Sequence, residues 1–193
     1  METFLVATGV VALAEIGDKT QLLALMLASR YRRPWPIVGG ILLATLLNHA
    51  GAAVIGSWIA DWLAGPWLKW VVGASFLGFA AWALVPDRLD ADKPFLQRGG
   101  VFVITTVAFF LVEIGDKTQF ATVALAARYA ATALVVAGTT LGMMLANVPV
   151  VWLGDRLAAA VPLRLVRGLA ALAFAALGLW VLVFGVGGAG LAR

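Results

Sequence analysis

Long, continuous runs of apolar residues make up most of this chain, and short polar or proline-containing stretches separate them. The runs are rich in Ala and Leu and do not alternate between polar and apolar positions, so they favour membrane helices over the strands of a membrane barrel. Crossing a bilayer takes ~20 apolar residues per helix. We therefore expect an all-α membrane protein with six transmembrane helices, at about 4–29, 35–60, 67–85, 100–127, 131–153 and 163–185.

The composition indicates that lipid surrounds these helices. Hydrophobic residues make up 63% of the 193 residues and charged residues 12%, against roughly 45–50% and about 25% in soluble domains. Six helices occupy about 120 residues, so an extramembrane domain is not expected. No basic run exceeds Arg30, Arg32 and Arg33. The net charge of +4 therefore indicates basic membrane loops and no nucleic-acid partner.

The basic residues also predict an orientation. The loops after the first, third and fifth helices hold nine of the 14 Lys and Arg residues, and the opposite side holds three. Loops rich in Lys and Arg lie in the cytoplasm, so both termini of this multi-pass protein are expected outside it. Tryptophans near predicted helix ends fit the two bilayer interfaces: Trp35, Trp58, Trp62, Trp67, Trp70 and Trp152.

The two halves of the chain share a motif at an offset of 98 residues. Glu-Ile-Gly-Asp-Lys-Thr-Gln occurs at 15–21 and at 113–119, and eleven of seventeen positions match between 15–31 and 113–129. This is a duplication. Because each unit has three helices, the two units enter the membrane from opposite sides, which predicts the inverted repeats of many secondary transporters. The predicted parts are repeat 1, a cytoplasmic linker and repeat 2, at 1–85, 86–99 and 100–193.

Each motif places two acidic residues near the middle of a predicted membrane helix. They are Glu15 and Asp18 in the first helix and Glu113 and Asp116 in the fourth. A charge at that depth costs ~2.5–3.5 kcal/mol, so these acids need partners, protons or a cation. Residues three apart share a helix face, and the glycine between them weakens the helix and frees carbonyls. If the motifs meet, up to four carboxylates form a metal site near the midplane.

Other polar residues in or near the motifs are weaker candidates. Each motif lysine follows a glutamate by four residues, so it either pairs with that glutamate or enters the site. Thr and Gln offer oxygens, although Thr often bonds back to a helix carbonyl. The asparagines either complete the oxygen shell or bond across helices, and the histidine either carries a proton or packs in the core. These supporting candidates are Lys19, Thr20, Gln21, Asn48, His49, Lys117, Thr118, Gln119 and Asn147.

The donor set favours a hard divalent cation. Carboxylate, amide and carbonyl oxygens suit magnesium, calcium and manganese, whereas softer metals prefer thiolates and imidazoles, and the chain has no Cys and one His. Four carboxylates and two lysines sum to −2, which one divalent ion neutralises. Salt bridges that only hold the bundle together, and a proton channel, remain as alternatives. No nucleophile–base pair is evident, so we do not expect an enzyme.

The two motifs, Glu15-Ile-Gly-Asp-Lys-Thr20 and Glu113-Ile-Gly-Asp-Lys-Thr118, resemble those of the Gdt-type calcium/manganese–proton antiporters. That family was once called uncharacterised protein family sixteen, within the lysine-exporter and cation-exchanger grouping. The resemblance covers essentially the whole chain and implies a secondary transporter of the bacterial inner membrane. Such a transporter exports manganese and/or calcium from the cytoplasm in exchange for protons. It implies that the acidic residues of both motifs hold the transported ion, with no resident cofactor. The alternatives are a lysine-exporter-like carrier of a cationic metabolite and a passive divalent cation channel; the oligomeric state is left open.

Overall fold

The protein is described by a computed structural model at residues 1–86, 99–154 and 162–186. These residues form eight α-helices and no strand, which confirms the all-α prediction. Among them, α3, α7 and α9 are long and apolar enough to cross a membrane, and α5 is a shorter apolar helix. In chain order the helices are α1 (Glu2–Glu15), α2 (Lys19–Tyr31), α3 (Pro34–Trp62), α4 (Pro66–Ala83), α5 (Val101–Glu113), α6 (Lys117–Arg128), α7 (Thr132–Leu153) and α9 (Leu163–Phe184).

Two of the predicted helices are interrupted. The segments predicted as single membrane helices at 4–29 and 100–127 each form two helices, which meet inside the repeated motif at the glycine that was expected to weaken the helix. The other four predicted helices agree with α3, α4, α7 and α9 to within two residues at each end. The predicted linker at 86–99 lies outside the described residues except for its two end positions.

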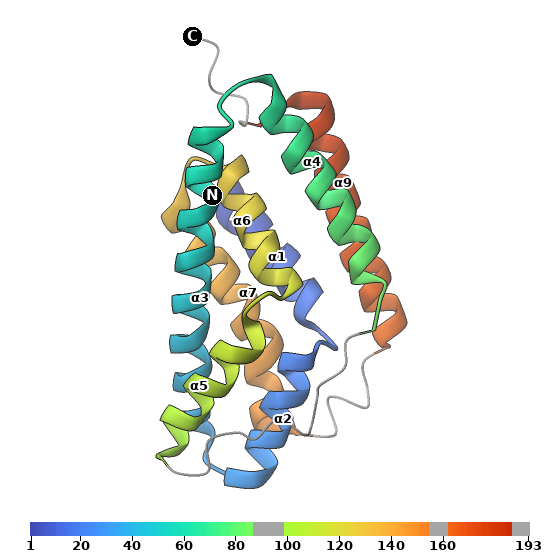
Figure 1. Ribbon diagram of the computed structural model, residues 1–193. Helices are drawn as coiled ribbons and strands as arrows, with labels where there is room; N and C mark the ends of the chain where they lie inside the picture. The colour runs from blue at the N-terminus through green and yellow to red at the C-terminus, as the bar shows by residue number, and fades with distance from the viewer. Residues whose placement is uncertain (87–98, 155–161, 187–193) are drawn as a thin grey trace.

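Helices of each half of the chain pack against helices of the other half. In Figure 1, α1 and α2 follow one another down the bundle, whereas α5 and α6 follow one another up it. The long helix α3 packs against α5 and α6, and α7 packs against α1 and α2. The helix that follows the interrupted helix in each half, α3 or α7, therefore packs against the interrupted helix of the other half.

Equivalent glycines make these two helix contacts close. A Cβ atom on Gly40 would lie 2.9 Å from the carbonyl oxygen of Phe102, and one on Gly138 would lie 2.6 Å from that of Phe4. The two glycines are 98 residues apart in the sequence, and so are the two phenylalanines. Small residues allow helix backbones to approach closely in membranes. Equivalent positions of the two repeats thus make equivalent helix–helix contacts.

The remaining pair, α4 and α9, lies side by side along one flank of the bundle (Figure 1). Gly73 and Gly178 bring the two helices together, since a Cβ on Gly178 would lie 2.9 Å from the Gly73 carbonyl oxygen. Phe76 stacks on Phe174 with ring centroids 6.4 Å apart. The main contacts of this pair with the rest of the bundle are to α1 and α6.

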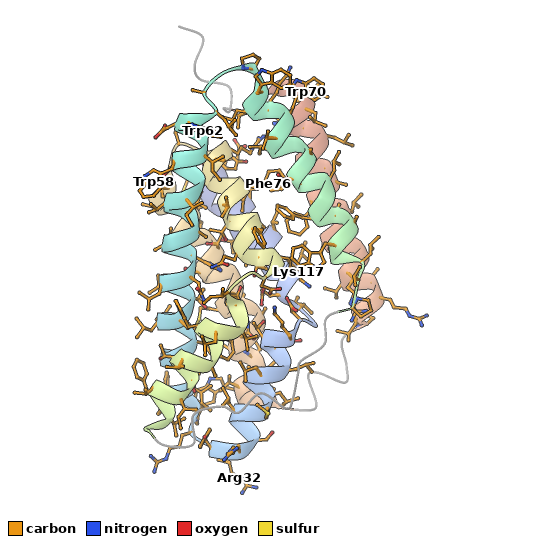
Figure 2. The ribbon with its side chains drawn as sticks, viewed as in Figure 1. Arg32, Trp58, Trp62, Trp70, Phe76 and Lys117 are labelled. Carbon is orange, nitrogen blue, oxygen red and sulfur yellow. The ribbon has the colours of Figure 1, made fainter. Side chains whose placement is uncertain are left out.

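The outer surface of the bundle is that of an integral membrane protein. Large apolar side chains such as Leu47 and Leu172 are exposed. Figure 2 shows Trp58, Trp62 and Trp70 gathered at one end, where indole rings favour the boundary between headgroups and acyl chains. The buried interior, in contrast, contains the acids of both motifs.

Candidate functional site

Each motif forms a break between two helices, and glycine makes the break possible. Gly17 and Gly115 have φ values of 81° and 77°, a left-handed conformation that residues with a Cβ adopt at a cost. The amide of Gly17 donates to Oε1 of Gln21 at 2.9 Å, and that of Gly115 to Oε1 of Gln119 at 2.8 Å. The glutamine thereby satisfies a backbone group that a membrane interior cannot hydrate.

The break also brings the acids of each motif together. The Asp18 amide donates to the Glu15 carbonyl at 3.1 Å, and the Asp116 amide to the Glu113 carbonyl at 3.0 Å. Each glutamate therefore ends one helix, and each aspartate precedes the next. The expectation that these pairs share a face of a continuous helix was wrong, because a turn joins them. An aspartate before a helix also suits the positive end of the helix dipole.

Acids from both motifs meet in the interior. One oxygen from each of Glu15, Glu113 and Asp116 lies within 4.8 Å of those from the other two. These residues are 0%, 2% and 1% exposed. Asp18 is also buried and forms an ion pair with Lys117 of the second motif. Two segments 98 residues apart in sequence thus build one acidic cluster.

The motif lysines cross between the two halves. Lys19 Nζ lies 3.0 Å from Asp116 Oδ1, and Lys117 Nζ lies 3.3 Å from Asp18 Oδ2. The sequence left open whether each lysine pairs with the glutamate four residues before it or enters the site, and the structure shows ion pairs between the two halves. The break interrupts the helix on which the spacing from lysine to glutamate depends. Figure 2 shows Lys117 at the centre of the bundle.

The motif threonines hold the glutamates. Thr20 Oγ1 donates to Glu15 Oε2 and Thr118 Oγ1 donates to Glu113 Oε1, each at 2.5 Å. Each threonine therefore fixes one oxygen of its own motif's glutamate. Among the described residues, Glu15, Glu113 and Asp116 each keep one buried carboxylate oxygen that lacks a hydrogen-bond partner: Glu15 Oε1, Glu113 Oε2 and Asp116 Oδ2.

The glutamines connect each break to the opposite half. Gln21 Nε2 donates to the Ala146 carbonyl at 3.0 Å, and Gln119 Nε2 donates to Asn48 Oδ1 at 3.5 Å. Asn48 in turn donates to the Phe110 carbonyl at 3.2 Å. Sequence reasoning did not single out Ala146, although it is the equivalent of Asn48 at the 98-residue offset. That offset was the signal that could have identified it.

The remaining two candidates are buried but are not part of the acidic group. His49 is fully buried, and neither of its ring nitrogens has a hydrogen-bond partner among the described residues. Asn147, its equivalent in the other half, donates to the Met143 carbonyl at 3.1 Å. Neither residue belongs to the three-carboxylate group, so metal binding by them stays a prediction.

Comparison with known proteins identifies the class and then the family. Residues 3–91 and 101–188 match the model of a family described as the divalent cation/proton antiporter GDT1, so the class is a membrane transporter that exchanges divalent cations for protons. A Vibrio cholerae serotype O1 protein named "Putative manganese exporter" is 55% identical over 168 residues, covering 86% of this chain and 84% of that protein. This chain belongs to the GDT1 family.

More distant relatives carry the same family name. A Synechocystis protein named "GDT1-like protein sll0615" is 32% identical over 141 residues, covering 61% of this chain and 66% of that protein. An Arabidopsis thaliana protein named "GDT1-like protein 5" is 28% identical over 153 residues, covering 60% of this chain and 67% of that protein. No solved structure matches this chain significantly.

Proposed function

We propose that this protein exports manganese from the bacterial cytoplasm in exchange for protons, with calcium as the other candidate cargo, and that both motifs bind the ion at one site. The relative named as a manganese exporter supports this cargo. The observation that carries the proposal is the convergence of Glu15, Glu113 and Asp116 within 4.8 Å. Two oxygens bound to one such ion at ~2.1–2.5 Å lie at most ~4–5 Å apart, so one ion can bridge carboxylates at this spacing.

The hydrogen bonds of the cluster prepare it for a cation. Thr20, Thr118 and Lys19 each hold one oxygen of a carboxylate. The second oxygen of each of these carboxylates is buried and has no hydrogen-bond partner among the described residues. A buried charged oxygen without a partner is costly. A divalent cation, or a proton on the same oxygen, removes that cost.

Competition for these oxygens couples the two fluxes. When the metal leaves, the acids lose the charge that balanced them, and protons take its place. When a metal ion arrives from the cytoplasm, it displaces the protons. Two protons per divalent ion would make the exchange electroneutral. No separate proton pathway is needed in this scheme, because the same carboxylates carry both ions.

The architecture that we propose around this site has six membrane crossings in two inverted three-helix repeats. The crossings are α1–α2, α3, α4, α5–α6, α7 and α9. The opposite course of the two interrupted helices and the equivalent contacts at Gly40 and Gly138 support it. The bias of Lys and Arg between loops supports termini outside the cytoplasm of the inner membrane.

Movement of the α4–α9 pair against the other helices is our proposed route to alternating access. This pair contacts mainly α1 and α6, which lie toward the predicted outer side. The Lys19 side chain is 21% exposed, whereas that of Lys117 is 5% exposed. Lys19 begins α2, which runs toward the predicted cytoplasmic side. We therefore propose that the cluster opens to the cytoplasm past Lys19.

Transport in proteoliposomes tests this function. Vesicles with an acidic interior should take up Mn²⁺ as protons leave, and Glu15→Gln or Glu113→Gln should abolish the uptake. Asp61→Asn changes an exposed acid outside the cluster and should transport normally. Persistent pH-driven uptake by both glutamate variants would refute the assignment.

The same vesicles separate the alternatives. Competition of lysine or arginine with Mn²⁺ would indicate a carrier of cationic metabolites. Flux that ignores the pH gradient and does not saturate would indicate a channel. Repeating the assay with Ca²⁺, Mg²⁺ and Zn²⁺ identifies the preferred cargo.

A further inference from the structure

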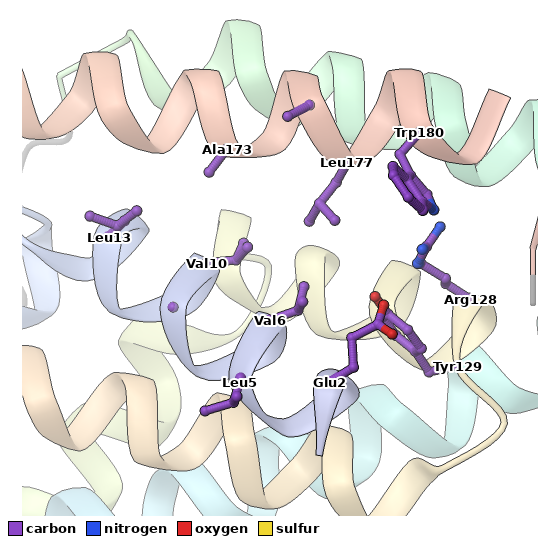
Figure 3. A pocket seen from close by; sticks show the side chains of 12 residues that line it. Glu2, Leu5, Val6, Val10, Leu13, Arg128, Tyr129, Ala173, Leu177 and Trp180 are labelled. Atoms are coloured by element: carbon purple, nitrogen blue, oxygen red, sulfur yellow. The ribbon is translucent and has the colours of Figure 1, made fainter. Parts of the chain in front are cut away.

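A cavity lies between α1 and α9, and none of the motif acids lines it (Figure 3). Its volume is about 460 Å³, within the range of ~300–1,000 Å³ that small-molecule sites occupy. Apolar side chains such as Val10, Leu13 and Leu177 form its walls. We call this cavity the α1–α9 groove.

One end of the groove is polar and contains a buried cation. Arg128 lines the groove and is 4% exposed. Within the described ranges, its Nε and Nη1 atoms have no hydrogen-bond partner and no acid forms an ion pair with it. Its guanidinium group lies 4.7 Å from the centre of the Tyr129 ring. Glu2 lines the same end but is exposed and does not pair with Arg128.

The equivalent arginine in the other half is placed differently. Arg30 lies 98 residues before Arg128 and stacks over Tyr31 in the same way, 5.5 Å from the ring centre. Arg30 is exposed, however, so water can satisfy its donors. The buried position of Arg128 beside an apolar groove is therefore not a simple consequence of the duplicated sequence.

We propose that the α1–α9 groove binds an anionic phospholipid, with an acyl chain along the apolar wall and the phosphate on Arg128. Guanidinium donors match phosphate oxygens in a bidentate geometry, and burying an unpaired charge is costly unless an anion joins it. Trp180 lies at the same end of the groove as Arg128 (Figure 3). Tryptophan favours the headgroup level of a bilayer, which places the phosphate at the depth of this arginine.

Native mass spectrometry of the purified full chain, titrated with phosphatidylglycerol or phosphatidylcholine, tests the charged end. Wild-type protein should bind phosphatidylglycerol more tightly than phosphatidylcholine. Arg128→Gln should weaken phosphatidylglycerol binding about tenfold, which corresponds to ~1.4 kcal/mol. Arg30→Gln is the matched control and should bind as wild type does. Equal binding of phosphatidylglycerol by wild type and Arg128→Gln would overturn the proposal.

A second variant tests the apolar wall without changing any charge. Gly9 lines the groove, and a Cβ atom there would meet nothing within 4 Å. Gly9→Leu should therefore fill part of the groove and reduce phosphatidylglycerol binding severalfold. Gly78→Leu, also in open space but on α4, is the control and should leave binding unchanged. Unchanged binding in Gly9→Leu would overturn the acyl-chain part.

Two further outcomes would assign the groove to another occupant. Inorganic phosphate that displaces phosphatidylglycerol completely at equal concentration would show that the acyl chain contributes nothing. A dimer that dissociates in Gly9→Leu would show that a second copy of the chain fills the groove. Either result would refute the lipid site.

Discussion

Lys19 of the first motif lies 3.0 Å from Asp116 of the second motif, although the two residues are almost a hundred positions apart in the sequence. The reciprocal pair, Lys117 with Asp18, is 3.3 Å apart. These crossed ion pairs join the two interrupted helices at the buried acidic cluster. A charge lost from one motif therefore leaves an unbalanced charge in the other.

Removing the charge of one partner of a crossed ion pair should lower the free energy of unfolding more than removing the charges of both partners. Lys117→Gln leaves Asp18 buried without this cation, and we expect it to lower the free energy of unfolding by ~3 kcal/mol. Adding Asp18→Asn should recover part of that loss. Unfolding in mixed micelles measures both, with Lys69→Gln as a control outside the cluster. Strictly additive effects of the two substitutions would contradict the crossed pairing.

Alanine should have opposite effects at two kinds of glycine. Gly115 has a φ of 77°, so Gly115→Ala should destabilise the protein by ~1–2 kcal/mol and disturb the break. Gly51 lies inside α3 with open space beside it, so Gly51→Ala should stabilise by ~0.5–1 kcal/mol. Thermal unfolding in detergent distinguishes the two. Equal effects would mean that the break does not need a left-handed residue.

The two helix contacts at equivalent glycines should be equally sensitive to added volume. Gly40→Leu and Gly138→Leu each place a side chain where backbone atoms lie within 3 Å of the Cβ position, and each should cost ~1–3 kcal/mol. Gly168→Leu, where nothing lies within 4 Å, should cost little. If only one of the first two variants loses stability, the packing of the halves is not equivalent.

Metal binding should weaken as the pH falls. Protons and the cation compete for the same carboxylates, so the apparent Kd of Mn²⁺ rises at low pH, by up to ~100-fold per pH unit if two protons are displaced. Calorimetry in buffers of different ionisation enthalpy measures the protons released. An affinity that is independent of pH, with no proton release, would separate metal binding from proton binding and contradict the coupling scheme.

Hydropathy and the repeated motif predicted most of the fold, because a continuous apolar run specifies a membrane helix almost independently of its neighbours. The ends of α3, α4, α7 and α9 followed from charges and prolines in this way. The motif glycines indicated a weakened helix at Gly17 and Gly115, but the left-handed backbone conformation of each break did not follow from the sequence, since glycine is common in membrane helices. The repeated spacing from each glycine to its glutamine contained the signal, but its role as a cap was not recognised.

The composition of the acidic cluster was predicted from the depth of its residues, but its pairing was not. Depth alone requires that Glu15 and Asp116 have partners, and it does not say which. The ion pair from Lys19 to Asp116 depends on how the two halves face each other, which is a property of packing. The burial of Arg128 likewise depends on where α9 lies, and the exposed equivalent, Arg30, gave no indication of it.

The stoichiometry of Mn²⁺ binding to single-motif variants tests most directly whether the two motifs form one site. Equilibrium dialysis against Mn²⁺ should find a single bound ion per chain for the wild type. Because the carboxylates of both motifs would hold that same ion, Glu15→Gln and Glu113→Gln should each abolish its binding. Two ions bound by the wild type, with one retained by each variant, would show that the motifs bind independently.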